Sequence, residues 1–171
     1  SYKTLSVSQV QSMPNVSIQR KVNKDDWGGF FGHSTINHDY NPEIISGDVV
    51  VVDNATGLMW HQNGSDHNYR LWDEVKEWIR KLNKGGYAGY HDWRLPTVDE
   101  AVSLLESSET NGDLYIDPVF SKKQRWIWTG DKFEDEDGSE AAWYVDFSSG
   151  GVFWHDDFND RSYVRPVRSV E

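Results

Sequence analysis

The sequence contains no cysteine, which excludes disulfide bonds, thiolate metal sites and enzymes with a cysteine nucleophile. It has no apolar run approaching the roughly 20 residues that a membrane-spanning helix needs, so no membrane insertion is expected. Basic residues are scarce too, because 17 Lys and Arg stand against 28 Asp and Glu, for a net charge of -11. Since affinity for nucleic acid comes largely from basic side chains that release counterions, the sequence predicts no nucleic-acid partner.

Two catalytic motifs are missing as well. The chain has neither the G-x-S-x-G of a nucleophile elbow nor the phosphate-binding G-x-x-x-x-G-K-[ST]. What it does have is 171 residues, enough for one domain with a core, and an aromatic content of 14% that includes nine Trp. These features favour a single domain with a tryptophan-rich core and give no support to an enzyme.

Hydrophobic periodicity predicts two helices followed by short strands. Apolar residues recur at three- and four-residue intervals from Asn68 to Lys84, where a pair of glycines ends the pattern. A second helix is expected from Thr97 to about Ser107. The expected strands are Val49–Val52, Trp126–Trp128, Ala141–Phe147, Val152–Trp154 and Tyr163–Val167. Because helices and strands occur in blocks and do not alternate, the pattern indicates an α+β fold with an antiparallel sheet.

The segment Asp92–Thr97, with the letters DWRLPT, joins an extended stretch to the start of the second helix. Its proline disfavours helical geometry at the preceding residue. Thr97 and Glu100 have the spacing in which each side chain bonds a free backbone N–H at a helix start, so the helix begins at Thr97. Arg94 is expected to stabilise this junction by pairing with the nearby carboxylate of Asp92.

This segment and others in order after residue 48 resemble the Legionella collagen-like protein C-terminal domain family and, more distantly, the formylglycine-generating enzymes. The matching segments are Asp53–Trp60, the predicted helix around Trp72, Asp92–Thr97, Tyr115–Phe120, Trp126–Thr129, Ala142–Phe147 and Tyr163–Arg168. The resemblance implies a C-type-lectin-like fold, in which two helices pack on a twisted antiparallel sheet with long loops and the first and last strands of the core pair. Val49–Val52 should therefore lie beside Val164–Val167. Formylglycine-generating enzymes depend on active-site cysteines, so this chain can share only their fold.

Residues 1–47 show no comparable resemblance. Residues 4–13 are compatible with a short helix that ends before a proline. Residues 23–47 hold several glycines among Asn and Asp, so they are expected to form a long loop. The predicted organisation is an N-terminal extension or lid over residues 1–47 that packs on a C-type-lectin-like domain over residues 48–171.

An acidic stretch over residues 131–140 is a candidate cation site. Hard cations such as calcium prefer carboxylate oxygens arranged by a flexible loop, and Asp131, Glu134, Asp135 and Asp137 carry such oxygens. The spacing does not fit an EF-hand, because an aromatic residue would occupy the first ligand position. A solvated acidic loop is the alternative, and no other cofactor is expected.

A mixture of aromatic and short polar residues near the C-terminus predicts a ligand-binding surface. Strand alternation assigns Trp143, Val145 and Phe147 to the core and turns Tyr144 to the opposite face. Aromatic rings give contact area at little entropic cost, and short polar groups give adaptable hydrogen bonds. The candidate ligand-binding residues are Trp128, Tyr144, Trp154, His155, Asp157, Asn159, Arg161 and Tyr163. An ordinary polar edge of the sheet is the alternative.

The resemblance implies a non-catalytic module that binds a glycan or a protein at the bacterial cell surface, in the periplasm or outside the cell. Related lectin-like folds also serve as variable display proteins of diversity-generating retroelements, and the polar residues from His155 to Tyr163 are compatible with that role. Two other classes stay open: a carboxylate- or metal-dependent hydrolase centred on His155 and Asp157, and a sensor or structural appendage of a larger protein. The sequence is also compatible with a homo-oligomer.

Overall fold

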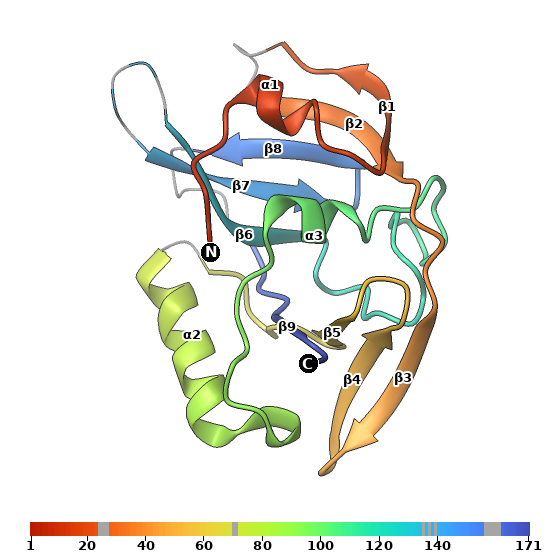
Figure 1. Ribbon diagram of the computed structural model, residues 1–171, viewed down its shortest axis with the longest axis vertical. Coiled ribbons are helices and arrows are strands. Elements are labelled where there is room, and N and C mark those ends of the chain that lie inside the picture. Colours follow the sequence, from red (N-terminus) through yellow and green to blue (C-terminus); the bar gives the residue numbers. More distant parts are fainter. Residues whose placement is uncertain (24–27, 70–71, 135, 137, 139, 156–161) are drawn as a thin grey trace.

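Two antiparallel sheets form the body of the protein (Figure 1). The computed structural model describes residues 1–23, 28–69, 72–134, 136, 138, 140–155 and 162–171. Within these residues the chain forms nine strands and a few short helices, which confirms the α+β class and is consistent with a C-type-lectin-like fold. Figure 1 shows the larger sheet above the smaller one, with the longest helix standing beside the smaller sheet. The expected single sheet is therefore divided into two.

The five-stranded sheet combines strands from both ends of the sequence. In spatial order its strands are β1 (Val16–Lys21), β2 (Gly28–Ser34), β8 (Gly151–His155), β7 (Glu140–Asp146) and β6 (Trp126–Glu134). All neighbouring strands pair antiparallel. The direct pairing of β2 with β8 makes the N-terminal strands an extension of a sheet whose other strands come from the C-terminal third.

The four-stranded sheet has the order β3 (Tyr40–Ile45), β4 (Asp48–Asp53), β5 (Leu58–His61) and β9 (Val167–Ser169). The last strand pairs with β5, where Trp60 lies opposite Val167. The expected pairing of Val49–Val52 with Val164–Val167 is therefore wrong, because β5 lies between the two segments. Both edges of β4 are occupied, by β3 and β5, so β9 cannot pair with β4 and lies beside β5.

The N-terminal residues are built into both sheets, and the expected long loop over residues 23–47 is wrong. That segment contains β2 and β3, and β3 pairs with β4 across the expected domain boundary after residue 47. The glycines that suggest a loop lie partly within β2, where other atoms leave no room for a side chain. A Cβ on Gly32 would lie 2.3 Å from the carbonyl oxygen of Ser17 in β1. Glycine here marks a close backbone approach.

The described residues include three α-helices and one short 3-10 turn. They are α1 (Val7–Val10), α2 (Trp72–Gly85), η2 (Tyr87–Gly89) and α3 (Val98–Val102). α2 is the longest of them and largely coincides with the first predicted helical span, although it begins later and includes Gly85, one residue beyond the predicted end. α3 begins after Thr97 as predicted but ends earlier than expected, and Leu104 and Leu105 are buried in the turns that follow it. α1 is likewise shorter than the predicted span of residues 4–13.

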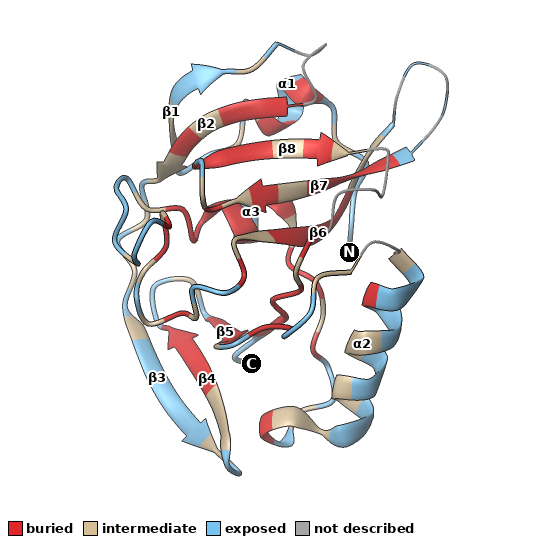
Figure 2. Cartoon of the chain, turned by 180° about the vertical axis from the view of Figure 1, so that it is seen from behind, coloured by how far each residue is buried: buried red, intermediate tan, exposed pale blue. Residues whose placement is uncertain are grey.

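The core lies between the five-stranded sheet and the helices α1 and α3. Trp143 and Val145 of β7 and Phe147 after it are fully buried, as strand alternation predicts. They belong to one cluster with Val10 of α1 and Val102 of α3. Figure 2 shows buried and partly exposed positions alternating along β7 and β8. The opposite face of this sheet is therefore left partly open.

Candidate functional site

Three aromatic rings lie side by side on the face of the five-stranded sheet that points away from α1 and α3. Tyr144 of β7 and Phe153 of β8 are paired across the two strands, and their ring centroids are 5.7 Å apart. Phe31 of β2 lies on the other side of Phe153, at a centroid distance of 5.4 Å. All three residues are partly exposed. We call Phe31, Phe153 and Tyr144 the outer aromatic row.

Two glycines make room for the central ring of the row. A Cβ on Gly151 would lie 2.3 Å from the ring of Phe153, and a Cβ on Gly28 would lie 2.9 Å from it. A side chain at either position would therefore displace the ring. Phe153 rests against the backbone of its own strand and of β2, which restricts its motion.

Polar groups stand at both ends of the outer aromatic row. The guanidinium carbon of Arg20 in β1 lies 4.4 Å from the centre of the Phe31 ring, a cation–π contact. At the other end, the ring of His155 lies 6.5 Å from that of Tyr144. A ligand on the row would meet apolar surface in the middle and hydrogen-bonding groups at the ends, an arrangement common in small-ligand sites.

Aromatic contacts continue from Tyr144 into the interior. Trp128 of β6 lies 6.5 Å from Tyr144 and 5.6 Å from Trp72 at the start of α2, measured between ring centroids. Its indole N–H donates to the carbonyl oxygen of Tyr69 at 3.2 Å, and only 1% of the residue is exposed. Trp128 therefore lies on the same face as Tyr144, its partner across the two strands, but is covered there by the start of α2.

The structure brings together only part of the predicted ligand-binding set. Tyr144 and His155 lie on the same face, and Tyr163 lies beside β6, with which it shares backbone hydrogen bonds. Trp128 and Trp154 are 1% and 6% exposed and belong to the core, which corrects their expected role as ligand contacts. The remaining predicted residues, Asp157, Asn159 and Arg161, lie outside the described residues.

Sequence reasoning misses three residues of this surface: Phe31, Phe153 and Arg20. Alternation along β8 could have identified Phe153, because it lies between the inward-facing Val152 and Trp154. The other two join the surface only through the pairing of β2 with β1 and β8. No local sequence pattern predicts a pairing between segments that are so far apart in the sequence.

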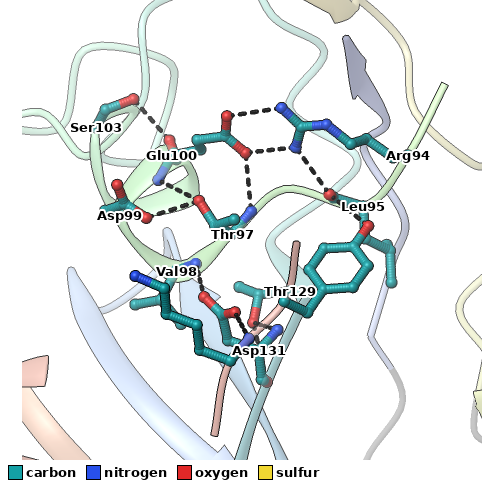
Figure 3. A network of polar contacts seen from close by, with 11 residues as sticks. Arg94, Leu95, Thr97, Val98, Asp99, Glu100, Ser103, Thr129 and Asp131 are labelled. Atoms are coloured by element: carbon teal, nitrogen blue, oxygen red, sulfur yellow. Dashed lines mark hydrogen bonds and ion pairs between the residues drawn. The ribbon is translucent and has the colours of Figure 1, made fainter. Parts of the chain in front are cut away.

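Asp131 is buried and bonds two backbone N–H groups at the start of α3 and near the N-terminus (Figure 3). One carboxylate oxygen accepts from Lys3 and the other from Val98, each at 2.8 Å. Val98 is the first residue of α3, so the carboxylate satisfies one of the free donors of a helix start. This corrects the expected role of Asp131 as a calcium ligand. The other candidates are Glu134, which is exposed, and Asp135 and Asp137, which lie outside the described residues.

Arg94 and Glu100 form a bidentate ion pair at the start of α3, with N–O distances of 2.6 and 2.9 Å (Figure 3). The predicted capping box is confirmed, since Thr97 and Glu100 each accept from the other's backbone N–H. Burial raises the pKa of Glu100, but hydrogen bonds from Arg94 and Thr97 outweigh it and hold the pKa below its usual value. The expected pair of Arg94 with Asp92 is wrong, because Asp92 accepts from Arg168 at 2.7 Å.

Beside the four-stranded sheet lies a buried polar centre made of Arg165, Gln124 and His61. The guanidinium of Arg165 donates to the carbonyl of His61 and the side chain of Gln124, both at 3.1 Å, and to the carbonyls of Gln62 and Ser121. Complete burial lowers the pKa of Arg165 to about 9. His61 accepts from the N–H of Gly64 at 2.9 Å. Burial, followed by the charge of Arg165, lowers the pKa of His61 to about 3.

Together these features define the class of the protein: an α+β domain of two antiparallel sheets, with α1 and α3 on one face of the larger sheet and a partly exposed aromatic row on the other. The model of the Lcl C-terminal domain family matches residues 49–168, so the chain belongs to this bacterial family. The match confirms the resemblance that the segments after residue 48 carry. Comparisons with curated proteins and with solved structures found no match. No helix among the described residues is long and apolar enough to cross a membrane.

Proposed function

We propose that this protein is a non-catalytic recognition module that binds a glycan through the outer aromatic row. The observation that carries the proposal is the placement of three partly exposed rings on one sheet face, with neighbouring centroids 5.4 and 5.7 Å apart. Large, stiff rings give contact area at low entropic cost. Their positions on paired strands favour a site that is formed before the ligand arrives.

A carbohydrate suits this surface better than a protein does. Sugar rings carry polarised C–H groups that are attracted to the negative face of an aromatic ring, whereas their hydroxyl groups need polar neighbours at the side. Arg20 and His155 stand at the two ends of the row, where such neighbours are needed. Even with all of their surface, three aromatic side chains provide less area than the roughly 800 Å² per partner of a stable protein interface.

Membership in the Lcl C-terminal domain family supports a role as an appendage domain outside the cytoplasm. We infer that the module presents the outer aromatic row to glycans at the cell surface or in the extracellular space. A display protein with a variable C-terminal segment is a finer form of this proposal, in which the segment begins at His155, the last residue of β8.

A glycan array probed with the whole chain tests this proposal. Phe153→Ala and Tyr144→Ala each remove one ring from the row and should weaken binding to the array ligands by roughly five- to tenfold. Tyr90→Ala is the matched control, because Tyr90 is also partly exposed but stacks on Arg168 at 3.6 Å, near the smaller sheet. The proposal is wrong if no glycan binds, or if the two row variants bind as the control does.

A hydrolase centred on His155 and Asp157 is the competing function. His155 is partly exposed at the end of β8, and Asp157 lies outside the described residues. Incubation with a panel of glycosides and phosphoesters separates the two functions. If the chain turns over a substrate and His155→Ala abolishes this activity, the protein is a hydrolase and the recognition module is wrong. Glycan binding without turnover supports the recognition module.

A further inference from the structure

A hollow of about 640 Å³ lies away from the outer aromatic row, between α2, β6 and the N-terminal segment. Its apolar walls come from Trp72 and Ile79 of α2, from Trp93 and Leu95 of the segment before α3, and from Tyr2. A volume of this size is typical of sites for small molecules. None of these residues belongs to the row.

The N-terminal wall of the hollow is fixed by several contacts. The hydroxyl of Tyr2 donates to the carbonyl of Leu95 at 2.9 Å, and its ring fills the space that a Cβ on Gly130 would need, at 2.1 Å. The backbone N–H of Lys3 donates to Asp131 at 2.8 Å. Because these contacts hold the segment against β6, the hollow exists without a ligand.

Cationic side chains gather around this hollow in an otherwise acidic protein. They are Lys3, Lys76, Arg80, Arg94 and Lys132, and Glu140 is the single carboxylate among the described lining residues. These five belong to the 17 Lys and Arg of a chain with a net charge of -11. Three of them pair with carboxylates, in the pairs Arg80–Glu77, Arg94–Glu100 and Lys132–Glu140. In the part of the chain that the structure describes, Lys3 and Lys76 form no ion pair, which leaves two positive charges without compensation.

We propose that this hollow binds a small organic carboxylate with a flat apolar body, of the aryl carboxylate class. The rings of Trp72 and Tyr2 and the side chain of Ile79 offer the apolar contact, and the charges of Lys3 and Lys76 attract the carboxylate. A purely inorganic anion gains nothing from the apolar walls. A neutral ring of the same shape gains nothing from the lysines.

Calorimetric titration of naphthoate into the whole chain tests the proposal. Lys76→Gln should weaken binding roughly three- to fivefold, the effect of losing one partly solvated ion pair. Lys81→Gln is the matched control, since Lys81 is exposed on the same helix and lies outside the hollow, and binding should not change. Naphthamide, which has the same body without the charge, should bind more weakly than naphthoate.

The proposal would be overturned by no measurable naphthoate binding, by equal affinities for naphthoate and naphthamide, or by equal effects of the two lysine substitutions. Displacement of naphthoate by inorganic sulfate at equal concentration would also overturn it, because charge alone would then suffice. Phe153→Ala should leave naphthoate binding unchanged. This variant therefore separates a failure of the hollow from a failure of the glycan site on the outer aromatic row.

Discussion

The two sheets differ in where they place their polar and aromatic side chains. The larger sheet buries one described carboxylate, Asp131 in its edge strand β6, and leaves the outer aromatic row partly exposed. Around the smaller sheet, charged and polar groups are buried, and Asp53, His61, Arg165 and Arg168 are at most 6% exposed. Each of these four forms several hydrogen bonds or stacking contacts with the chain around it.

This difference separates residues that specify the fold through buried hydrogen bonds from partly exposed residues on a surface that a ligand can reach. A buried polar group that loses a partner leaves donors or acceptors without hydrogen bonds, so its neighbours constrain it strongly. A partly exposed ring on a sheet face has no such requirement. The row can therefore change its ligand preference at small cost to stability, whereas the buried polar centre cannot change alone.

The largest expected effect is that of Arg165→Ala. The substitution removes the donor to four acceptors that lie at or near the buried polar centre, and it leaves a cavity beside Phe120, whose ring lies 4.9 Å from the guanidinium. We expect a loss of more than about 3 kcal/mol in the free energy of unfolding, measured by urea denaturation.

The control for this substitution is Arg125→Ala. Arg125 also pairs with a carboxylate, at 3.0 Å from Asp113, but both side chains are largely exposed. Pairs of this kind contribute little to stability, so the unfolding midpoint should hardly move. Equal effects of the two substitutions would show that the buried polar centre does not specify the fold.

His61 is expected to make the free energy of unfolding depend on pH, by about 2 kcal/mol. The unfolded chain binds a proton at this residue below about pH 6.5, whereas burial keeps the folded imidazole neutral down to a pKa of about 3. The stability that the neutral imidazole provides is therefore fully present above about pH 6.5 and is lost progressively as the pH falls toward about 3. Between about pH 7.5 and 5 the loss amounts to about 2 kcal/mol.

Urea denaturation at both pH values measures this effect. His61→Asn keeps an acceptor near the N–H of Gly64 but removes the titration, so it should lose the part of the pH dependence that His61 supplies. His91→Asn is the control, because His91 is exposed. If His61→Asn retains the full pH dependence of the original chain, protonation of another group governs stability in this range.

Asp131→Asn should cost between about 1 and 2 kcal/mol, because an amide can offer only one acceptor to the two N–H groups that the carboxylate bonds. Thermal unfolding with and without calcium measures the effect. Calcium should shift the midpoint of neither protein, since both oxygens of Asp131 already serve the backbone. A calcium-dependent stabilisation that Asp131→Asn removes would restore this residue as a metal ligand.

The sequence predicted the elements that local patterns determine. The helix start at Thr97 follows from its spacing to Glu100, and the burial of Trp143 and Val145 follows from strand alternation. The same alternation turns Tyr144 to the outer face, where its ring lies beside that of Phe153.

The sequence alone does not predict contacts between residues that lie far apart along the chain. Arg94 binds Glu100 instead of Asp92 because Arg168, brought in by β9, takes the Asp92 carboxylate. Phe31 joins the outer aromatic row because β2 pairs with β8. The glycines of β2 are of the kind that is common in loops, so the sequence of this segment does not indicate a strand. Pairings of this kind depend on the whole fold, and no short segment encodes them.

Apart from the control substitutions, the smallest expected effect on stability is that of Tyr144→Ser in the outer aromatic row. Its neighbour Val145 is fully buried on the other face of β7, so Val145→Ser is a matched comparison at the next position of the same strand. We expect Tyr144→Ser to change the free energy of unfolding by less than about 1 kcal/mol and Val145→Ser to lower it by more than about 2 kcal/mol. Urea denaturation of both variants measures the difference. If Tyr144→Ser costs as much as Val145→Ser, the row is part of the core, and its residues are constrained by packing in the same way as those of the opposite face.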